Sequence, residues 1–114
     1  MNLVINVDQI EQKSIVEVSG EIDVYTADRL KEKLLPLTEE KGNLVQVDLQ
    51  NISYMDSTGL GVFISAYKST KAHGSTLELI NARDRVLRLF IITGLHEIIN
   101  LRVEDKGGNE SEGF

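Results

Sequence analysis

An acid, two hydroxyls and two glycines stand close together in the stretch MDSTGLG, residues 55–61. Side chains of these types occur in nucleophilic sites, in phosphate-binding loops, at helix starts and at sites of phosphorylation. The stretch follows an apolar run, which places it at the end of a buried element. Four roles are therefore open for Ser57: nucleophile, phosphate cradle, helix cap or modified side chain.

The residues around Ser57 argue against catalysis. A nucleophile elbow is G-x-S-x-G, and Met55 stands where the first glycine is required. A serine hydroxyl also needs a base, and neither His73 nor His96 has an evident partner role. A P-loop requires G-x-x-x-x-G-K-[ST], whereas the glycines here are closer together and no lysine follows them.

Helix capping is the simplest structural role for this stretch. Asp56 and Ser57 are both suitable caps, because a side-chain oxygen there satisfies an orphan backbone N–H, worth about 1 kcal/mol. A cap leaves Gly59 and Gly61 unexplained, since glycine inside a helix costs up to about 1 kcal/mol relative to alanine. The two glycines indicate a strained turn or a close approach to the backbone.

Phosphorylation is a further possibility for either side chain. Asp56 follows a predicted strand, as the acceptor aspartate of a receiver domain does, but residues 7–9 lack the acidic pair that holds Mg²⁺ in those domains. Ser57 is expected at an exposed helix start, where a phosphate would add roughly −1.5 to −2 charges. The free N–H groups of the helix would tolerate this anion, whereas a docked partner would be repelled. One modification could then switch a complex, because each 1.4 kcal/mol changes affinity about tenfold.

Hydrophobic periodicity predicts the elements that position this stretch. Strands are predicted at residues 3–7, 14–19, 44–49, 76–81 and 101–103. The polar turn between the first two makes them an antiparallel hairpin, and helical segments separate the others. The order β-β-α-β-α-β-α-α-β predicts an α/β fold: a mixed sheet with parallel crossovers and about four helices. Function in such sheets concentrates at the carboxyl ends of the strands, where MDSTGLG lies.

Several boundary residues are also predicted. Thr26 is the expected N-cap of the first helix, Pro36 should kink it or loosen its last turn, and Gly42 should end the element. Asn81 is expected to cap the third helix, and Thr93 to restart a short helical turn. The buried stripe of the first helix is predicted as Ala27, Leu30, Leu34 and Leu37.

The composition bounds the class of protein. The 114 residues suit one domain, predicted at residues 1–104, with a disordered tail at 105–114. The net charge of −6 makes nucleic acid and anionic membranes poor partners and favours a basic surface on another protein. Cysteine is absent, and the two histidines lack metal-ligand spacing, so neither thiol catalysis nor a zinc site is expected. Without a signal peptide or a long apolar run, a soluble cytoplasmic protein is expected.

Four segments together resemble one known family. They are GEID at residues 20–23, a helix with Leu30 and Leu34, YMDSTGLGVF at residues 54–63 and RLFIITGL at residues 88–95. This combination closely resembles the anti-sigma factor antagonists of the STAS domain family, of the RsbV type and similar to SpoIIAA. The likeness covers about residues 2–104 and implies the STAS fold. D-S-x-G-L-G with an upstream G-E-I-D is specific, although neither motif alone would be.

The resemblance implies a partner-switching regulator and not an enzyme. In such a switch the unphosphorylated antagonist binds an anti-sigma factor that is also a serine kinase, of the RsbW type. The sigma factor is thereby released to RNA polymerase for stress-response transcription. The kinase inactivates the antagonist by phosphorylating the serine of the DS motif, here Ser57, and a PP2C-type phosphatase reverses this. No cofactor, metal, direct nucleic-acid contact or membrane contact is implied.

The resemblance also implies a partner-binding surface around Ser57. The loop and kinase-contact residues would be Asp56, Thr58, Gly59 and Gly61. Glu21 and Asp23 would lie at the same end of the sheet and join this surface, although Asp23 equally suits a turn or a cap.

The second helix adds a hypothesis from its own spacing. Its predicted core positions are Leu60, Phe63, Ile64 and Tyr67. A second stripe consists of Thr58, Gly61, Val62, Ser65 and Ser69. These side chains are small and would admit a partner close to the helix backbone. We expect this face to dock the kinase, the alternative being an ordinary solvated face.

Overall fold

The structure, a computed structural model, describes residues 2–103, so the predicted disordered tail at residues 105–114 lies outside the described residues. Strands and helices alternate in the predicted order. They are β1 (Leu3–Ile10), β2 (Lys13–Ile22), α1 (Ala27–Thr38), β3 (Leu44–Met55), α2 (Ser57–His73), β4 (Thr76–Ile80), α3 (Asp84–Ile92), the 3₁₀ turn η1 (Leu95–Glu97) and β5 (Asn100–Arg102).

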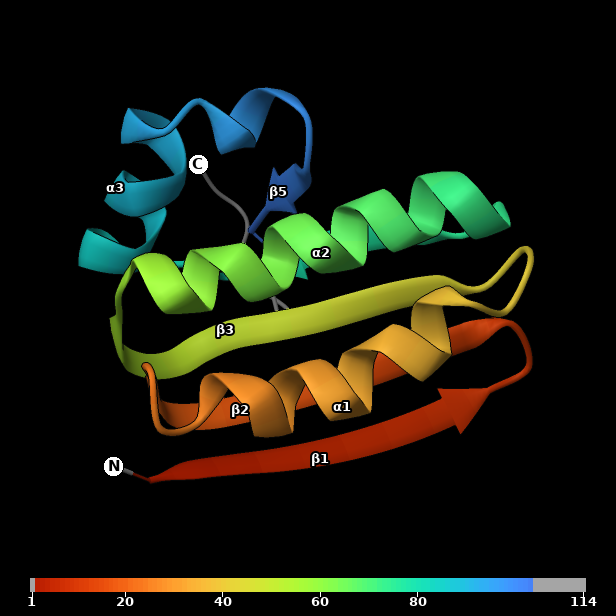
Figure 1. Cartoon of the computed structure of the whole chain (residues 1–114), viewed down its shortest axis with the longest axis horizontal. Coiled ribbons are helices and arrows are strands. Elements are labelled where there is room, and N and C mark those ends of the chain that lie inside the picture. The colour runs from red at the N-terminus through yellow and green to blue at the C-terminus, as the bar shows by residue number, and fades with distance from the viewer. Residues whose placement is uncertain (1, 104–114) are drawn as a thin grey trace, which may run out of the picture.

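The described strands form one mixed sheet in the order β1-β2-β3-β4-β5 (Figure 1). β1 and β2 make the predicted antiparallel hairpin, with Ile10 opposite Lys13, and every later pair is parallel. Parallel neighbours require crossover connections, and helical segments provide each of them. The predicted α/β fold is confirmed, with three α-helices and a 3₁₀ turn among the described residues.

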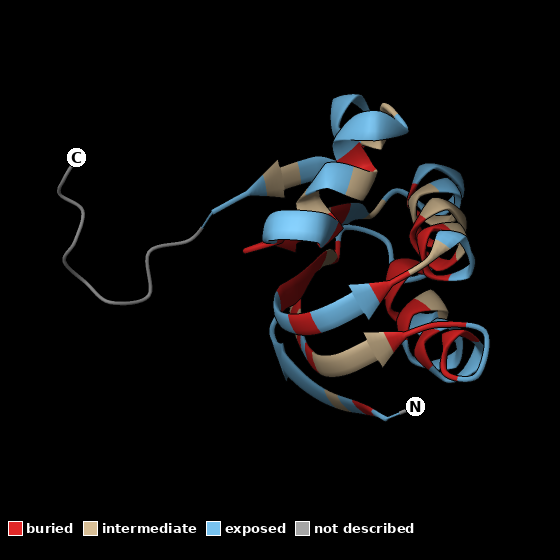
Figure 2. Cartoon of the chain, turned by 90° about the vertical axis from the view of Figure 1, so that its left-hand side faces the viewer, coloured by how far each residue is buried: buried red, intermediate tan, exposed pale blue. Residues whose placement is uncertain are grey.

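The core lies between the sheet and two neighbouring helices. α1 and α2 run side by side across one face of the sheet (Figure 1). The buried residues concentrate where these helices meet the strands (Figure 2), and they include the whole predicted stripe of α1. Phe63 of α2 packs edge-to-face against Phe90 of α3, with ring centroids 5.9 Å apart, so the third helix shares this core.

β3 is longer than the sequence predicts. The strand continues from residue 49 to Met55, because it pairs with the end of β2 through Glu21 opposite Tyr54 and Ile22 opposite Met55. Two register shifts in β2 accompany this pairing, between Glu17 and Ser19 and between Gly20 and Glu21. Residues 50–54 are mostly polar, so their composition does not predict that they pair with β2. As a result, Ser57 stands just beyond the end of a central strand.

Two boundary predictions at the third helix are wrong. Asn81 does not cap α3: it is buried, its backbone N–H donates to Arg102 O at 2.9 Å, and Arg83 occupies the N-cap position. Thr93 does not restart a helix, since its hydroxyl donates to Leu89 O at 2.7 Å and closes α3. The next turn begins at Leu95.

The end of α1 follows the prediction for Pro36 but not that for Gly42. The backbone N–H of Glu39 is shared between Leu35 O at 3.2 Å and Pro36 O at 3.3 Å, so the last turn is loosened. The helix ends at Thr38, before Gly42. At its other end Thr26 occupies the N-cap position, as predicted, although its side chain makes no capping hydrogen bond.

Candidate functional site

The junction between β3 and α2 is held by Asp56. Its backbone is extended (φ −116°, ψ −170°), and its Oδ1 accepts hydrogen bonds from the backbone N–H groups of Thr58 at 3.0 Å and Gly59 at 3.2 Å. Asp56 is therefore the helix cap, and Ser57 is the first helical residue. The Ser57 side chain is exposed, and its hydroxyl makes no hydrogen bond within the described part of the chain.

The two glycines of this stretch have different structural roles. A Cβ on Gly59 would lie 2.7 Å from Met55 Cγ, 2.8 Å from Ile22 Cγ2 and 3.1 Å from Ile22 O. Gly59 therefore lets the first turn of α2 approach the ends of β2 and β3. A Cβ on Gly61 would meet nothing within 4 Å. Only the first glycine is required by internal packing, and the second leaves open space on the helix surface.

The loop after β2 is built around Asp23 and Thr26. Asp23 Oδ1 accepts from the backbone N–H groups of Tyr25 at 2.9 Å and Thr26 at 3.2 Å. The Thr26 hydroxyl accepts from Asp23 N at 2.9 Å and donates to Glu21 O at 2.8 Å. Both side chains are buried. This reciprocal arrangement fixes the loop and turns Val24 and Tyr25 outward, with 64% and 79% of their surfaces exposed.

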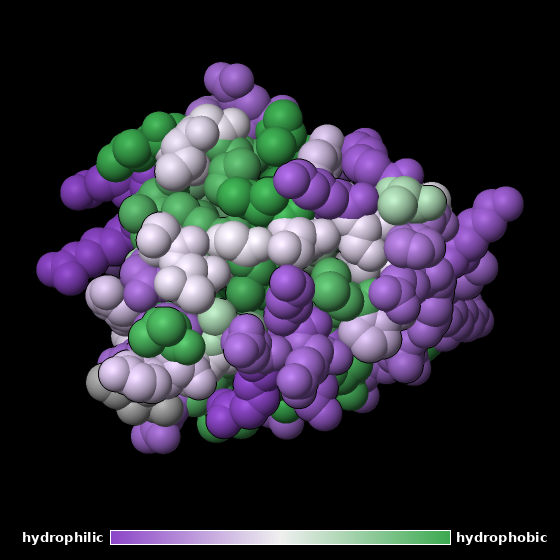
Figure 3. Space-filling view, in the orientation of Figure 1, coloured by the Kyte–Doolittle hydropathy of each residue, from purple (hydrophilic) through white to green (hydrophobic). Residues whose placement is uncertain are grey.

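The loop after β2 and the junction between β3 and α2 lie at the same end of the sheet, where both strands finish. Ile22 is opposite Met55 in the register, and Asp56 N donates to Ile22 O at 3.3 Å. The exposed Val24–Tyr25 tip therefore neighbours the start of α2, at the left-hand edge in Figure 1. Figure 3 shows the same face: a pale row of side chains, neither strongly hydrophilic nor strongly hydrophobic, follows α2 between the other helices.

Burial separates the predicted site residues into three groups. Ser57 and Thr58 are exposed, and four others are partly buried: Glu21, Asp56, Gly61 and Ser65. The buried group is Asp23, Gly59 and Val62. The Val62 side chain is only 4% exposed, so it packs in the core and leaves the predicted small-residue stripe. The predicted core positions Ile64 and Tyr67 are only half-buried.

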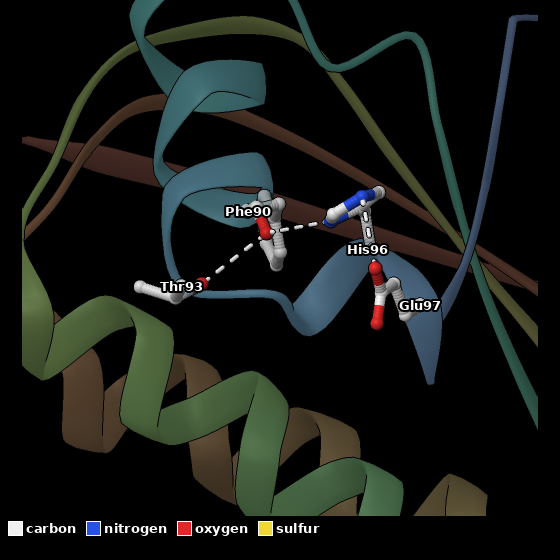
Figure 4. Close-up of polar contacts among 4 residues, drawn as sticks. All are labelled: Phe90, Thr93, His96 and Glu97. Carbon is white, nitrogen blue, oxygen red and sulfur yellow. Dashed lines mark hydrogen bonds and ion pairs between the residues drawn. The ribbon is translucent and has the colours of Figure 1, made fainter.

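Within the described residues, neither histidine makes a hydrogen bond to Ser57 that would make it the base of a serine nucleophile, and each contacts a carbonyl oxygen elsewhere. His73 ends α2, about 24 Å away along the helix at 1.5 Å per residue. Its Nδ1 lies 2.8 Å from Ser69 O, within the last turn. His96 stands with Thr93 at the end of α3, where both contact the Phe90 carbonyl oxygen, and Glu97 is 4.0 Å away (Figure 4). Both histidines are engaged at helix ends.

The described residues contain no group of three His, Cys, Asp or Glu side chains that could hold a metal ion. Nor is any helix in residues 2–103 long and apolar enough to cross a bilayer. Away from this junction, the carboxyl of Glu78 in β4 has a pKa below its usual value. Burial alone would raise the pKa of this carboxyl, but hydrogen bonds from Arg102 and Gln46 and the charges of Arg102 and Lys13 outweigh burial and lower it.

Comparison with known proteins identifies the family. The sequence model of the STAS domain matches residues 4–106. The anti-sigma-B factor antagonist of Bacillus subtilis is 47% identical over 108 residues, which cover 95% of this chain and 98% of that protein. The chain belongs to the STAS domain family, among the anti-sigma factor antagonists. The anti-sigma-B factor antagonist of Listeria monocytogenes is also similar, at 45% identity over 90% of each chain.

Solved structures of STAS proteins share the fold. The crystal structure of an anti-sigma factor antagonist from Mycobacterium paratuberculosis aligns with a TM-score of 0.75 at 25% identity, covering 89% of this chain and 86% of that one. SpoIIAA in its unphosphorylated form aligns with a TM-score of 0.73 over 90% of each chain, and its 16% identity supports the fold alone. The match to the STAS domain family gives no support to a receiver domain. Anti-sigma factor antagonists are regulators, not enzymes.

The exposed apolar tip of this STAS domain, Val24 and Tyr25, is not predicted by the motifs of the sequence. Val24 and Tyr25 directly follow Asp23, and their side chains face solvent although both residue types are often buried. The sequence does contain a signal of this exposure. Two large side chains stand between a turn-forming aspartate and the helix cap position, and they belong to neither the strand pattern before them nor the helix pattern after them. Tyr54 is a further exposed aromatic residue at this end of the sheet.

Proposed function

We propose that this STAS domain acts in the cytoplasm as the antagonist of an anti-sigma factor that is also a serine kinase. The unphosphorylated form binds this partner and frees the sigma factor, and phosphorylation of Ser57 ends the binding. A PP2C-type phosphatase restores the active form. The observation that carries the proposal is that Asp56 does the capping, which leaves the exposed Ser57 hydroxyl unengaged at the helix start.

The chemistry requires little of this chain beyond presentation. In the transfer, Ser57 Oγ forms a bond to the γ-phosphorus of ATP, the bond to the bridging oxygen of ADP breaks, and a base of the kinase takes the hydroxyl proton. The absence of a nearby histidine partner is compatible with this role, because the attacking hydroxyl is activated by the other protein. The exposed position allows the kinase site to close around it.

A phosphate on Ser57 would meet an occupied helix terminus. Asp56 Oδ1 already accepts from the Thr58 and Gly59 N–H groups, which are two of the donors that an anion at this terminus would use. The phosphate would add roughly −1.5 to −2 charges beside this carboxylate. It must therefore displace Asp56 or turn outward toward the partner. Either change disfavours the complex without requiring the sheet to refold.

The proposed docking surface combines two elements. From α2 it takes Ser57, Thr58, Gly61 and Ser65, and from the loop after β2 it takes Val24 and Tyr25. Thr58, Gly61 and Ser65 are spaced three and four residues apart, so they lie on one helix face. The open space at Gly61 permits close approach, and exposed Tyr25 has the character of a residue that anchors an interface. Asp23 and Gly59 support this surface from within, and Glu21 lies at its border.

The proposal is tested by incubation with a candidate anti-sigma factor kinase and ATP, followed by mass spectrometry of the phosphopeptide. The phosphate is expected on Ser57, stable to mild acid and hydroxylamine. Ser57→Ala should abolish the modification, whereas Thr76→Ala, at an exposed residue outside the docking surface, is the matched control that keeps it. A phosphate on Thr58 in the wild-type protein, or a label on Ser57→Ala, contradicts the assignment. An acid-labile label would instead indicate an acyl phosphate on Asp56.

A further inference from the structure

β1 is the outermost strand of the sheet, and no described element covers its free edge. It stands first in the strand order, pairs only with β2 and runs along the lower border in Figure 1. Its eight residues keep a continuous register with β2, without a bulge. One side of its backbone therefore offers hydrogen-bonding groups that no neighbouring strand takes.

The direction of each backbone group follows from the ladder. Glu21 N donates to Asn2 O at 2.9 Å, and the register that puts Leu3 opposite Gly20 puts Asn2 opposite Glu21. In an antiparallel pair such hydrogen-bonded positions alternate with positions that face away. The even-numbered residues of β1 therefore bond to β2, and the odd-numbered ones face outward. Arg29 of α1 supports this, because its guanidinium donates to the outward carbonyl oxygen of Leu3.

The sequence of β1 lacks the usual protection of an edge strand. Natural edges are shortened, bulged, covered or supplied with lysine or proline. LVINVDQI contains no lysine, arginine or proline, and Asp8 is its one charge. Val4 and Ile10, near the two ends of the strand, are 56% and 62% exposed, and Val7 between them is 39% exposed. This edge has free backbone groups and unburied apolar side chains together.

We propose that β1 pairs with β1 of a second copy of this chain, antiparallel and centred on Val7. In this register the outward positions match: Val7 lies opposite Val7 of the second copy, and Ile5 lies opposite Gln9. Each such pair exchanges two backbone hydrogen bonds, so the three pairs make six. The even-numbered positions form the non-hydrogen-bonded pairs of this register. In these pairs the Val4 side chain lies opposite Ile10, and the Asn6 side chain lies opposite Asp8.

Other registers fail for identifiable reasons. Centring between two residues would set outward-facing groups opposite groups that are already bonded to β2. Centring on Asp8 would set this charge opposite its own copy. Centring on Asn6 would leave two complete pairs, Ile5 with Val7, because the next pair needs the Leu3 carbonyl oxygen. Centring on Ile5 would require the Leu3 carbonyl oxygen, which Arg29 holds. Centring on Gln9 would place Val7 opposite Glu11, which has φ 55° in the hairpin turn. The Val7 register also sets the single charge, Asp8, opposite an amide and not opposite its own copy.

The pairing joins two sheets at β1, the edge opposite β5 in the strand order. The two-fold axis places the two Ser57 junctions at opposite ends of the joined sheet, so both remain accessible. A contact through one strand falls in the small interface class, below about 1,200 Å², so the dimer is expected to be weak, with Kd on the order of 100 μM. It is expected to form whether or not Ser57 is phosphorylated.

The register is tested with cysteines, because the chain has none of its own. Val4→Cys and Ile10→Cys proteins, mixed under mild oxidation, should form a disulfide, since a non-hydrogen-bonded pair brings Cα atoms to about 4.5 Å. Val4→Cys alone should not cross-link, because its two copies would be about 20 Å apart at 3.4 Å per residue. Equal cross-linking of Val4→Cys alone, or no cross-link in the mixture, overturns the register.

Sedimentation equilibrium from about 10 μM to 1 mM tests the dimer itself. The mass of the wild-type protein should rise with concentration, and Val7→Pro should weaken association at least tenfold. The Val7 N–H faces outward, so proline there removes no bond to β2. Val4→Lys is the second variant should Val7→Pro fail to fold, and Ile92→Lys is the matched control on another exposed apolar side chain. A monomer at every concentration, or a loss caused by Ile92→Lys alone, overturns the proposal.

Discussion

Gly59 of α2 packs directly on Ile22 of β2, so closely that a Cβ would lie 2.8 Å from Ile22 Cγ2 and 3.1 Å from its carbonyl oxygen. This contact sets how closely the first turn of α2, which carries Ser57, approaches the end of the sheet. It also separates the roles of the two glycines in the motif and leads to the first prediction.

Gly59→Ala should destabilise the protein, whereas Gly61→Ala should stabilise it slightly. The clash at Gly59 is expected to cost about 1–3 kcal/mol, partly offset by the better helix propensity of alanine. Gly61 has open space, so only the propensity gain of about 0.5–1 kcal/mol remains. Urea unfolding of both variants measures the difference. Equal shifts in the same direction would contradict the packing role of Gly59.

Ser57→Ala should retain the affinity for the anti-sigma factor and resist inactivation, whereas Ser57→Asp should bind at least about tenfold more weakly. The added carboxylate would stand beside the Asp56 carboxylate, which is already committed to two N–H groups. Calorimetric titration provides the measurement. Thr76→Asp places the same charge on an exposed residue at the start of β4 and should leave the affinity unchanged.

Bulky substitutions on the exposed face of α2 should weaken the complex and leave the fold intact. Gly61→Leu or Ser65→Leu would fill the space that the partner is proposed to approach. A loss of affinity of about tenfold or more, with an unchanged urea midpoint, is expected from a calorimetric titration. Lys33→Leu, on an exposed position of α1 outside the docking surface, is the matched control. Wild-type affinity in both bulky variants would remove α2 from the docking surface.

Substitutions at Asp23 and Tyr25 should separate effects on the stability of the fold from effects on partner binding. Asp23→Ala removes the acceptor of two backbone N–H groups in a buried turn, which is expected to cost about 1–3 kcal/mol of unfolding free energy. Tyr25→Ala should cost little stability, because the side chain is exposed, but should weaken partner binding about tenfold or more. Thermal unfolding and titration together test the pair. A large loss of stability in Tyr25→Ala would contradict the outward orientation of this loop.

Glu78 should contribute to the acid sensitivity of the fold. Its pKa in the folded state is lowered from 4.5, so its contribution is present above the unfolded pKa and is lost as the pH falls through the folded pKa. Glu78→Gln should therefore destabilise the protein at pH 7 and lose less stability than wild type between pH 7 and acidic pH. Urea unfolding across that range measures the two slopes. Parallel slopes would show that this carboxyl does not contribute.

The order of strands and helices could be predicted because apolar periodicity is a local property. Leu30 and Leu34 mark the buried face of α1 by their spacing alone, and the polar turn before Lys13 marks the hairpin. Predictions failed where a distant partner decides the local structure. The segment 50–54 is polar but extends β3 because the end of β2 pairs with it. Asn81 resembles a cap but is buried, with its backbone N–H bonded to Arg102 O of β5.

The motif predicts that Ser57 follows a strand, begins a helix and lacks the glycine of a nucleophile elbow, since these depend on residue types and spacing. Only the tertiary structure decided that Asp56, and not Ser57, caps the helix, because spacing leaves both oxygens within reach of the same N–H groups. It also decided that Val62 is buried and that Val24 and Tyr25 are exposed. Burial depends on which surfaces the other elements cover, and β2, α1 and α3 set those surfaces from far along the chain.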